Sequence, residues 1–341
     1  MIRALGLLLS GLAFGVSAGA APSAACHSQF ARQKINVVVP FKPGGGYDLY
    51  ARLLAPVLED VTGTRVAIVN MPAAQGHVAM KTVANPPASA ITLGLMDLRV
   101  IMSRRLADPA IPPTSAYVAL GSFGQSMGLW ASKTPHVAFF AAREPITAAG
   151  GGGTGLRVLL PASLLQREVR FVQGYLGMNE RVLALLRGEI DMVDGPDDTI
   201  LRLTGNAGVA PIMVLARAPV PSLPGTPYLA GPGGLVDEAT RNLPPVQRRR
   251  SMELADVAVG LATGIRSVIV ASTVREPLRR CLEAAVEEAL FSAQLREAAA
   301  KQKAAYEPMR GAQVREETAR IERLMQRHLE LLRDFVVRAR S

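Results

Sequence analysis

The strongest constraint on the fold is a repeated alternation of short β-branched runs with amphipathic helical patterns. Apolar runs cover residues 35–39, 65–69 and 91–95, and helical spacing covers 49–61 and 76–84 between them. Strands that are separated by helices pair in parallel, because the helix carries the chain back along the face of the sheet. The pattern therefore predicts an α/β fold with a parallel sheet, whose ligand site lies beyond the carboxyl ends of the strands.

A second series of the same kind fills the middle of the chain and predicts a second α/β unit. Strand-like runs and helical patterns alternate, in order, at 146–149, 156–166, 169–172, 179–187, 190–193, 198–204 and 209–214. The stretch 219–245 is rich in proline and glycine, which predicts long surface loops. A strand at 267–270 and helices at 274–290 and 312–337 follow. The last helix has the apolar spacing of a packing helix.

Glycine-bearing segments stand between several of the predicted strands and helices. They are PFKPGGGYD (40–48), NMPAAQG (70–76), GGGGTG (150–155) and VDGPDD (193–198). The first N–H groups of a helix have no intrahelical partner and the peptide dipoles add positive potential, so an anion is stabilised there. Glycine removes the Cβ that would hold a carboxylate away from the main chain. We therefore expect these segments to offer N–H donors to an acid group, with Asp48 capping its helix and pairing with Arg52.

The first twenty residues predict a secretory signal peptide. One positive charge, Arg3, precedes an uncharged apolar stretch, and small residues lead to a predicted cleavage site after Ala20. An uncleaved anchor and a form lipidated at Cys26 are alternatives, although Ser23 stands where a lipoprotein signal has a large aliphatic residue. We expect export to the periplasm. In that oxidising compartment Cys26 and Cys281 either form a disulfide or remain two separate thiols.

The charge of the chain argues against a nucleic-acid partner. The formal net charge is +10, but aromatic residues make up 5% of the sequence and the densest basic cluster, 248–250, contains none. Nucleic-acid surfaces combine clustered cations with aromatic residues. A positive excess favours anionic ligands through long-range attraction. We interpret it as a solvated surface with a mild preference for anions, and we expect no nucleic acid among the partners.

Candidate catalytic motifs lack the surroundings that they need. GQSMG (124–128) matches the G-x-S-x-G nucleophile motif around Ser126, which requires a helix directly after the serine, but the following segment has strand character. A crossover between domains is the expected structure there. The acidic cluster at 191–198 fits no calcium loop, the histidines have no zinc spacing, and GGGGTG lacks the Lys-Ser/Thr ending of a phosphate-binding loop. We therefore predict no catalytic residue, no metal and no cofactor.

Several of these segments together resemble the Bug-type extracytoplasmic substrate-binding proteins of tripartite tricarboxylate transporters. The resemblance rests on VVVPFKPGGGYDLYARLLAPVLE, VAIVNMPAAQGHVAMKTVA, TLGLM and GYLGMNERVLALLRGEIDMVDG, which occur in this order before the helical tail. It implies a type II periplasmic-binding-protein fold, in which two α/β domains joined by a hinge enclose a ligand cleft. The implied domains are 33–121 plus 262–341 for domain 1 and 122–261 for domain 2, after a signal peptide over 1–20.

The resemblance also implies ligand-binding residues. Those carried over are Phe41, Gly44, Gly45, Gly46 and Asp48 from the first loop, Asn70, Pro72 and Gly76 from the second loop, and Thr154, Gly155, Gly174, Tyr175 and Asp194 from the second domain. The chain departs from the family pattern at 73–75, where it lacks two glycines, and at Lys42, which adds a charge to the first loop. Gln75 is therefore an added ligand-binding candidate, and Lys42 is a second source of side-chain contacts.

The implied function is transport. A monomeric periplasmic receptor would capture a small organic carboxylate, close around it by a hinge motion and deliver it to the permease subunits of a tripartite transporter, without enzymatic activity. Two alternatives from other classes stay open. A sensor accessory would report the same closed form to a membrane kinase, and a secreted hydrolase would use Ser126. The sequence does not name the carboxylate.

Overall fold

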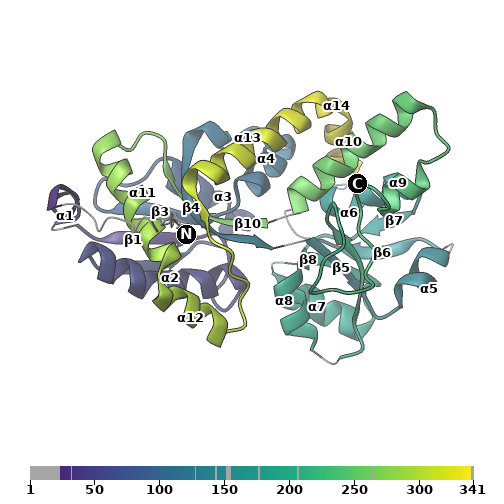
Figure 1. Cartoon of the computed structure of the whole chain (residues 1–341), viewed down its shortest axis with the longest axis horizontal. Helices are drawn as coiled ribbons and strands as arrows, with labels where there is room; N and C mark the ends of the chain where they lie inside the picture. Colours follow the sequence, from purple (N-terminus) through teal and green to yellow (C-terminus); the bar gives the residue numbers. More distant parts are fainter. Residues whose placement is uncertain are drawn as a thin grey trace, which may run out of the picture.

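The structure is a computed structural model that describes residues 24–31, 33–126, 128–142, 144–150, 155–175, 177–205, 207–262 and 264–338. Two lobes lie side by side, and each is built around its own β-sheet with helices on both faces (Figure 1). The predicted signal peptide, residues 1–20, lies outside the described residues. The architecture is the two-lobed α/β fold that the sequence predicts.

The first sheet has six strands in the order β11-β4-β10-β3-β1-β2. Their bounds are Ile35–Val39 (β1), Val66–Asn70 (β2), Ile91–Met96 (β3), Tyr117–Ser126 (β4), Gly264–Ala271 (β10) and Met309–Arg310 (β11). β1 pairs in parallel with β2 and β3, as the helical connections predict. β10 runs antiparallel to both β3 and β4, and β11 runs antiparallel to β4. The parallel pairing predicted for the first three strands is confirmed, and the sheet as a whole is mixed because β4, β10 and β11 add antiparallel pairs.

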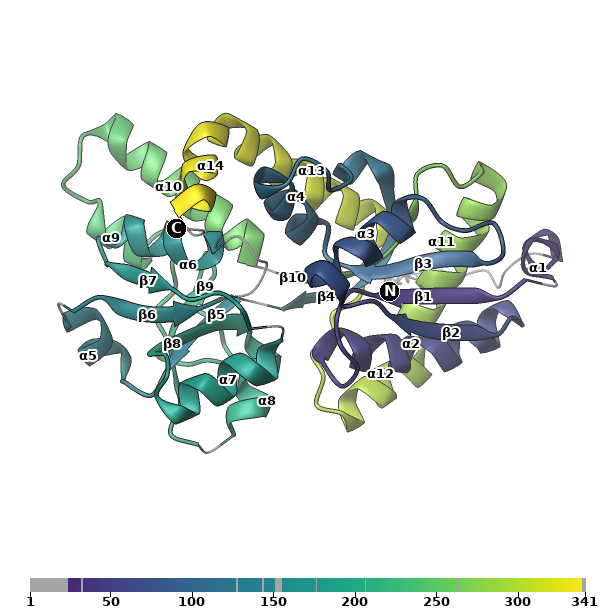
Figure 2. The ribbon, with the colours of Figure 1, turned by 180° about the vertical axis from the view of Figure 1, so that it is seen from behind.

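Helices cover both faces of this first sheet (Figure 2). One face carries α1 (Ala24–Phe30), α2 (Gly46–Thr62), α11 (Glu276–Phe291) and α12 (Ala293–Lys301), and the other carries α3 (His77–Ala84), α4 (Leu98–Ala107) and α13 (Gly311–Arg327). Side chains alternate between the two faces of a strand. Val37 and Val39 accordingly pack in the core with α2 and α11, whereas Val38 packs in the core with α3 and α13.

The second sheet has five strands in the order β7-β6-β8-β5-β9. Their bounds are Gly128–Ser132 (β5), Ile146–Ala149 (β6), Val169–Phe171 (β7), Met192–Pro196 (β8) and Ala210–Leu215 (β9). β6 pairs in parallel with β7 and β8, and β5 runs antiparallel to β8 and β9. The strand predicted at 190–193 thus extends to Pro196, so most of the fourth glycine-bearing segment is strand and the helix begins directly at Asp197.

Helices also cover both faces of the second sheet. They are α5 (His136–Ala141), α6 (Leu156–Leu164), α7 (Met178–Arg187), α8 (Asp197–Thr204), α9 (Leu235–Ala239), α10 (Pro245–Ala262) and α14 (Leu329–Arg338), while the short 3₁₀ turns η1 (Ala73–Gly76) and η2 (Thr114–Ala116) belong to the first lobe. Trp130 faces the core shared by α6, α10 and α14, whereas its neighbours Leu129 and Ala131 face the core shared by α7 and α8. Among the described helices we find none that is both long and apolar enough to span a membrane.

Several helical features differ from the predictions. The region predicted as surface loops, 219–245, contains α9, and its residues Leu229, Ala230 and Val236 are fully buried in the second-lobe core. The helix predicted over 312–337 is interrupted at His328, where α13 ends. The His328 ring lies 3.0 Å from a carboxylate oxygen of Glu253 in α10, a tertiary contact that the local pattern does not contain.

The chain passes between the lobes along neighbouring paths. It leaves the first sheet at the end of β4, starts the second sheet at β5, and returns from α10 into β10. β4 and β10 are paired neighbours, with Gly264 opposite Ser126, so both crossings lie together. α13 begins on the first lobe and continues through α14 to the second (Figure 1), where Ile321 and Leu332 join the core.

A disulfide joins Cys26 of α1 to Cys281 of α11, with a Cα–Cα distance of 5.2 Å. The sequence left open whether these two cysteines are bonded, and the structure has them bonded. The bond holds the short helix α1 at the outer end of the first lobe, far from the second lobe (Figure 1).

Candidate functional site

A cavity of about 300 Å³ lies between the two lobes. The first lobe lines it with segments that follow β1, β2 and β3, and the second lobe with segments that follow β6, β7 and β8. These are the carboxyl ends of the parallel strands, where α/β sheets bind ligands. Arg266 of β10 completes the wall near the crossings. The cavity therefore lies where the strand-and-helix pattern of the sequence places a site.

The start of α2 forms one wall of the cavity. Gly45 is the N-cap and has no side-chain cap, and Gly45, Gly46 and Tyr47 line the cavity. The first N–H groups of α2 have no intrahelical acceptor, so they are available to an anion. A Cβ on Gly46 would lie 3.2 Å from Oγ1 of Thr199 in α8, so glycine permits the two lobes to approach closely here.

Asp48 does not line the cavity, but its hydrogen bonds hold this loop in shape. Its Oδ2 accepts hydrogen bonds from the Gly44 N–H at 2.9 Å and from Arg52 Nε at 2.8 Å, and its Oδ1 accepts one from Asn70 Nδ2 at 3.0 Å. Asn70 also donates to the Phe41 carbonyl oxygen, also at 3.0 Å. Burial acts to raise the pKa of Asp48, but these hydrogen bonds outweigh it and hold the pKa below its ordinary value. The predicted pairing of Asp48 with Arg52 is confirmed, whereas the prediction that Asp48 caps its helix is wrong, because the N-cap is Gly45 and Asp48 lies inside the first turn.

The second loop presents Gln75 to the cavity through unusual backbone geometry. Ala74 and Gln75, of which Gln75 is a departure from the family pattern, have left-handed φ values of 50° and 55°. Gly76 has φ 86°, and a Cβ there would lie 2.7 Å from Cβ of Pro40. Gly76 therefore serves close packing between two loops, while Pro72 and Gln75 line the cavity. Arg104 of α4 donates a hydrogen bond to the Gln75 carbonyl oxygen.

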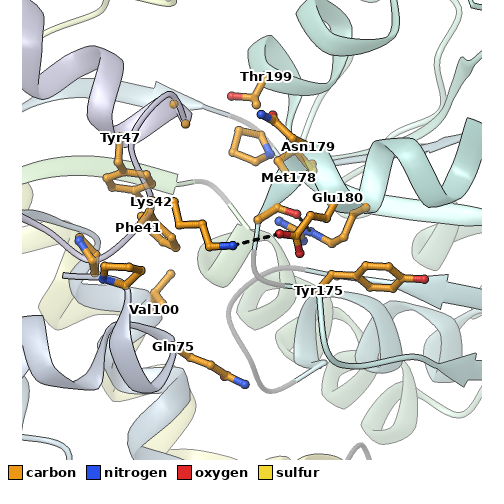
Figure 3. Close-up of a pocket in the computed structure, with 18 of the residues that line it drawn as sticks. Phe41, Lys42, Tyr47, Gln75, Val100, Tyr175, Met178, Asn179, Glu180 and Thr199 are labelled. Atoms are coloured by element: carbon orange, nitrogen blue, oxygen red, sulfur yellow. Dashed lines mark hydrogen bonds and ion pairs between the residues drawn. The ribbon is translucent and has the colours of Figure 1, made fainter. Parts of the chain in front are cut away.

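An ion pair crosses the cavity. Lys42 Nζ of the first lobe lies 3.3 Å from Glu180 Oε1, in the first turn of α7 in the second lobe (Figure 3). Both side chains are about half exposed. Figure 3 shows Phe41, Tyr47 and Gln75 on one side of this bridge and Tyr175, Met178 and Asn179 on the other. The lobes are thus in direct contact around the cavity.

Buried arginines surround the cavity. Those that line it are Arg104, Arg157, Arg181 and Arg266, and Arg99 lies next to them. Four of these five, all except Arg157, are at most 9% exposed. Burial lowers the pKa of Arg104 to about 10 and that of Arg181 to about 10. The interpretation of the basic excess as a solvated surface is therefore wrong for these residues.

Buried aspartates balance some of these arginines. Asp194 Oδ2 lies 2.9 Å from Arg157 Nη2, and Asp194 is fully buried. Asp97 lies 3.5 Å from Arg99. The acidic cluster at 191–198, considered in the sequence as a metal site, thus supplies Asp194 as a counterion for an arginine. Its backbone carbonyl oxygen also accepts a hydrogen bond from Arg181 at 3.1 Å.

Asp198 joins the two lobes near the crossings. Its carboxylate accepts from Arg266 Nη2 at 2.7 and 2.9 Å and from the Tyr50 hydroxyl at 3.1 Å. The Arg266 guanidinium also stacks 4.3 Å above the ring centroid of Tyr50. Burial raises the pKa of the Tyr50 hydroxyl, so it stays a hydrogen-bond donor at neutral pH. Asp198 lies in the first turn of α8 of the second lobe, so this network ties that helix to the first sheet.

The residues implied by the resemblance fall into distinct positions. Those that line the cavity are Phe41, Gly45, Gly46, Pro72, Gln75, Gly174 and Tyr175. Those that are described but lie outside the lining are Gly44, Asp48, Asn70, Gly76, Gly155 and Asp194. Thr154 lies outside the described residues. The predicted loops of both lobes are therefore brought together, and about half of the named residues lie in these loops without lining the cavity.

Sequence reasoning missed the arginines of the site. A signal was present for Arg181, which shares a helix face with the buried residues Ala184 and Leu185 at spacings of three and four. A basic residue on the buried face of a helix indicates a buried charge. The same signal was present for Arg157 of α6, which has the buried residues Leu160 and Pro161 at the same spacings.

The hydrolase alternative meets a structural objection. Ser126 is the last residue of β4, and Gly128 begins β5 of the other sheet. The nucleophile motif requires a sharp turn from a strand into a helix. A strand follows here, which fits the expected crossover between domains.

No protein-family model matches the chain, and no curated protein sequence matches it significantly. Solved structures do match. MatC from Rhodopseudomonas palustris with bound malate is 19% identical with a TM-score of 0.65, over 86% of this chain and 99% of MatC. A second R. palustris protein, with adipate, is 19% identical with a TM-score of 0.66, over 87% and 97% of the two chains. The periplasmic binding protein BugD is 18% identical with a TM-score of 0.63, over 89% and 98%.

Two α/β lobes with a cavity at the ends of their strands define the fold of the periplasmic binding proteins. Within that class, the chain has the fold of BugD and MatC. The similarity extends over nearly the full length of both structures. The fold that the resemblance implies from the sequence is confirmed.

Proposed function

We propose that this protein is a Bug-type periplasmic receptor that binds a small organic carboxylate between its lobes. It then delivers the acid to the permease subunits of a tripartite tricarboxylate transporter. The observation that carries the proposal is the cavity itself, which combines the open start of α2 with an arginine-rich wall. Export rests on the predicted signal peptide. Solute capture requires no covalent step, so the proposed role is that of a carrier and not of an enzyme, and we expect the carrier to be a monomer.

The lining supports a ligand with an acid group and a short carbon skeleton. N–H groups at the start of α2 and cationic side chains attract the acid, and Phe41, Phe171 and Met178 offer contact to carbon atoms. The acids in the two R. palustris structures, malate and adipate, are of this kind. The volume of about 300 Å³ suits a small molecule.

Hinge closure would couple binding to delivery. The crossings from β4 to β5 and from α10 to β10 lie next to the domain borders expected after residues 121 and 261. Rotation there would open the cavity, because two neighbouring strand ends can absorb the change in backbone angles. A ligand that contacts both lobes stabilises the closed form, and the permease would recognise that form.

A thermal-shift screen tests the carboxylate receptor. The mature protein is incubated with pairs of diacids and monoacids of equal length, namely succinate with butyrate and adipate with hexanoate, together with malate and citrate. A ligand that binds the folded state alone raises the unfolding temperature with concentration. Lysine and glucose serve as controls without a net negative charge. The proposal fails if none of the acids raises the unfolding temperature above these controls.

Replacement of Gly45 tests the start of α2 as the anion site. Gly45 has φ −81°, and a Cβ there would lie 3.6 Å from the Lys42 carbonyl oxygen, an ordinary contact. Gly45→Val should therefore fold normally while its side chain occupies the approach to the N–H groups. We expect the ligand-induced shift to be lost in Gly45→Val and reduced in Gly45→Ala, at an unchanged unfolding temperature without ligand. A full ligand response in Gly45→Val would remove this helix start from the site.

A further inference from the structure

Arg181 is a buried cation of the cavity wall, and its hydrogen bonds within the described part of the chain go to neutral oxygens. Its Nε donates to the Gly177 carbonyl oxygen at 3.3 Å and its Nη1 to the Asp194 carbonyl oxygen at 3.1 Å. The side chain is 9% exposed and lines the cavity from α7. Among the described residues, no carboxylate lies within ion-pair distance, 4.0 Å, of Arg181.

The neighbouring Arg157 adds a second positive charge beside Arg181. Arg157 pairs with the buried Asp194 carboxylate, whereas Arg181 bonds to the backbone carbonyl oxygen of Asp194 and feels its carboxylate only at longer range. The buried Arg157 Nε has no hydrogen-bond acceptor among the described residues. Burial lowers the pKa of Arg181, and the positive charge of Arg157 lowers it further, while Asp194 opposes both. Glu180 of the same wall also acts on Arg181, but it forms its ion pair with Lys42 of the first lobe. The buried part of this wall therefore has two guanidinium groups and one carboxylate, an imbalance that is costly in a poorly hydrated place unless an anion arrives.

We propose that Arg181, supported by Arg157, binds an anionic group of the ligand from the second lobe. This inference rests on the proposed function and adds a second acid-binding position to the same cavity. Main-chain N–H groups of α2 hold one acid group on the first lobe, and guanidinium groups hold another on the opposite wall. The preferred ligand is accordingly a diacid that connects the two lobes. Arg181 is the residue that selects it over a monoacid of equal length.

The Arg181→Met variant separates ligand recognition from support of the fold. Methionine keeps an unbranched chain of similar length but removes the charge. Replacing a buried cation that has no carboxylate partner by an apolar residue is neutral or stabilising for the free protein. The ligand, in contrast, loses a charge-assisted hydrogen bond. In Arg181→Met, ligand affinity is therefore expected to fall while the unfolding temperature without ligand stays equal or rises. The loss of a purely structural residue would not produce this combination.

The matched control is Arg187→Met. Arg187 ends the same helix, its side chain is 63% exposed, and it pairs at 3.8 Å with Glu189 on the surface. Its loss changes the net charge by the same amount without touching the cavity. Arg181→Lys keeps the charge but loses the planar guanidinium and is expected to have intermediate affinity. Affinities of wild type and variants for succinate, butyrate, adipate and hexanoate are measured by calorimetry, and unfolding temperatures are measured without ligand.

In Arg181→Met we expect affinity for the preferred diacid to fall by about tenfold to a hundredfold, and affinity for the matching monoacid to change by less than about threefold. The unfolding temperature without ligand should stay equal or rise, and Arg187→Met should match wild type. An unchanged diacid-to-monoacid ratio in Arg181→Met would overturn the inference alone. A clearly lower unfolding temperature would do the same, because Arg181 would then be structural. If no acid binds the wild-type protein, both the proposed function and the inference about Arg181 are wrong.

Discussion

Single residues of the first loop divide into those that face the cavity and those that hold the loop in shape. Asp48 belongs to the second kind, because its carboxylate takes up the Gly44 N–H and bonds to Arg52 and Asn70. The N–H groups left over at the helix start are those beside the cavity, at Gly45 and Gly46. A motif residue can therefore shape the loop beside a cavity without lining the cavity itself.

Asp48→Asn is predicted to remove a pH-dependent part of the stability. The folded-state pKa of Asp48 lies below its ordinary value of 3.8, so the carboxylate stabilises the fold above that pH. This contribution is lost as the pH falls through the folded-state value. The difference in unfolding free energy between wild type and Asp48→Asn should thus be largest near about pH 7 and shrink by about pH 3. Urea titrations at several pH values measure it.

The control for Asp48 is Asp60→Asn. Asp60 lies on the exposed side of α2, and Asp60→Asn removes the same charge from the same helix as Asp48→Asn. If Asp48→Asn and Asp60→Asn show the same dependence on pH, the hydrogen-bond network around Asp48 does not contribute to stability.

At the level of elements, the loop before α2 and the first turn of α7 face each other across the cavity. Lys42 comes from the one and Glu180 from the other (Figure 3). Lys42 was a departure from the family pattern in the sequence, and the structure gives it a partner 138 residues away. The pair lies in a position to hold the lobes together over a bound ligand, although two half-exposed charges attract each other weakly in water.

Charge reversal tests this contact between elements. Lys42→Glu and Glu180→Lys should each speed ligand dissociation by about twofold to fivefold, because like charges then repel across the mouth of the cavity. The double variant with both changes restores opposite charges and should return towards the wild-type rate. High salt should reduce all of these differences. Stopped-flow dissociation measures the rates, and additive effects in the double variant would exclude a direct interaction.

At the level of the whole molecule, long-range connections decide how the lobes are held. β4 and β10 pair beside the crossings, Asp198 of α8 reaches Arg266 of β10, and α13 continues into α14 over the second lobe. A different connection, the disulfide between Cys26 and Cys281, closes a loop of 255 residues in sequence but ties only α1 to α11. It lies at the far end of the first lobe from the cavity (Figure 1).

The disulfide is therefore predicted to affect stability without affecting binding. Cys26→Ser combined with Cys281→Ser should lower the free energy of unfolding by about 2–5 kcal/mol, because the unfolded chain gains freedom when a long loop is opened. Affinity for any acid found in the screen should stay within about twofold of wild type, since no contact of the cavity changes. Urea unfolding and calorimetry measure the two quantities. A loss of affinity would show that α1 influences the lobe contacts.

Much of the fold followed from local sequence patterns. The apolar runs and helical spacings placed β1, α2, β2, α3 and β3 within a few residues, because each depends on side chains that are close in sequence. The loops at 40–48 and 70–76 were located for the same reason, and residues from both line the cavity. The break at His328 and the helix α10 were not found, since contacts between distant segments contribute to both.

The sequence by itself determined the alternation of strands and helices, the glycine-bearing loops at strand ends and hence the edge of the sheet where the cavity lies. These features depend on backbone geometry and on neighbours within one or two turns. The tertiary structure alone decided that β10 runs antiparallel beside β4, that Cys26 bonds to Cys281, and that Asp194 contacts Arg157 through its carboxylate and Arg181 through its backbone carbonyl oxygen. Such pairings join residues from separate elements, and their energy comes from burial and charge that exist only once the chain has folded.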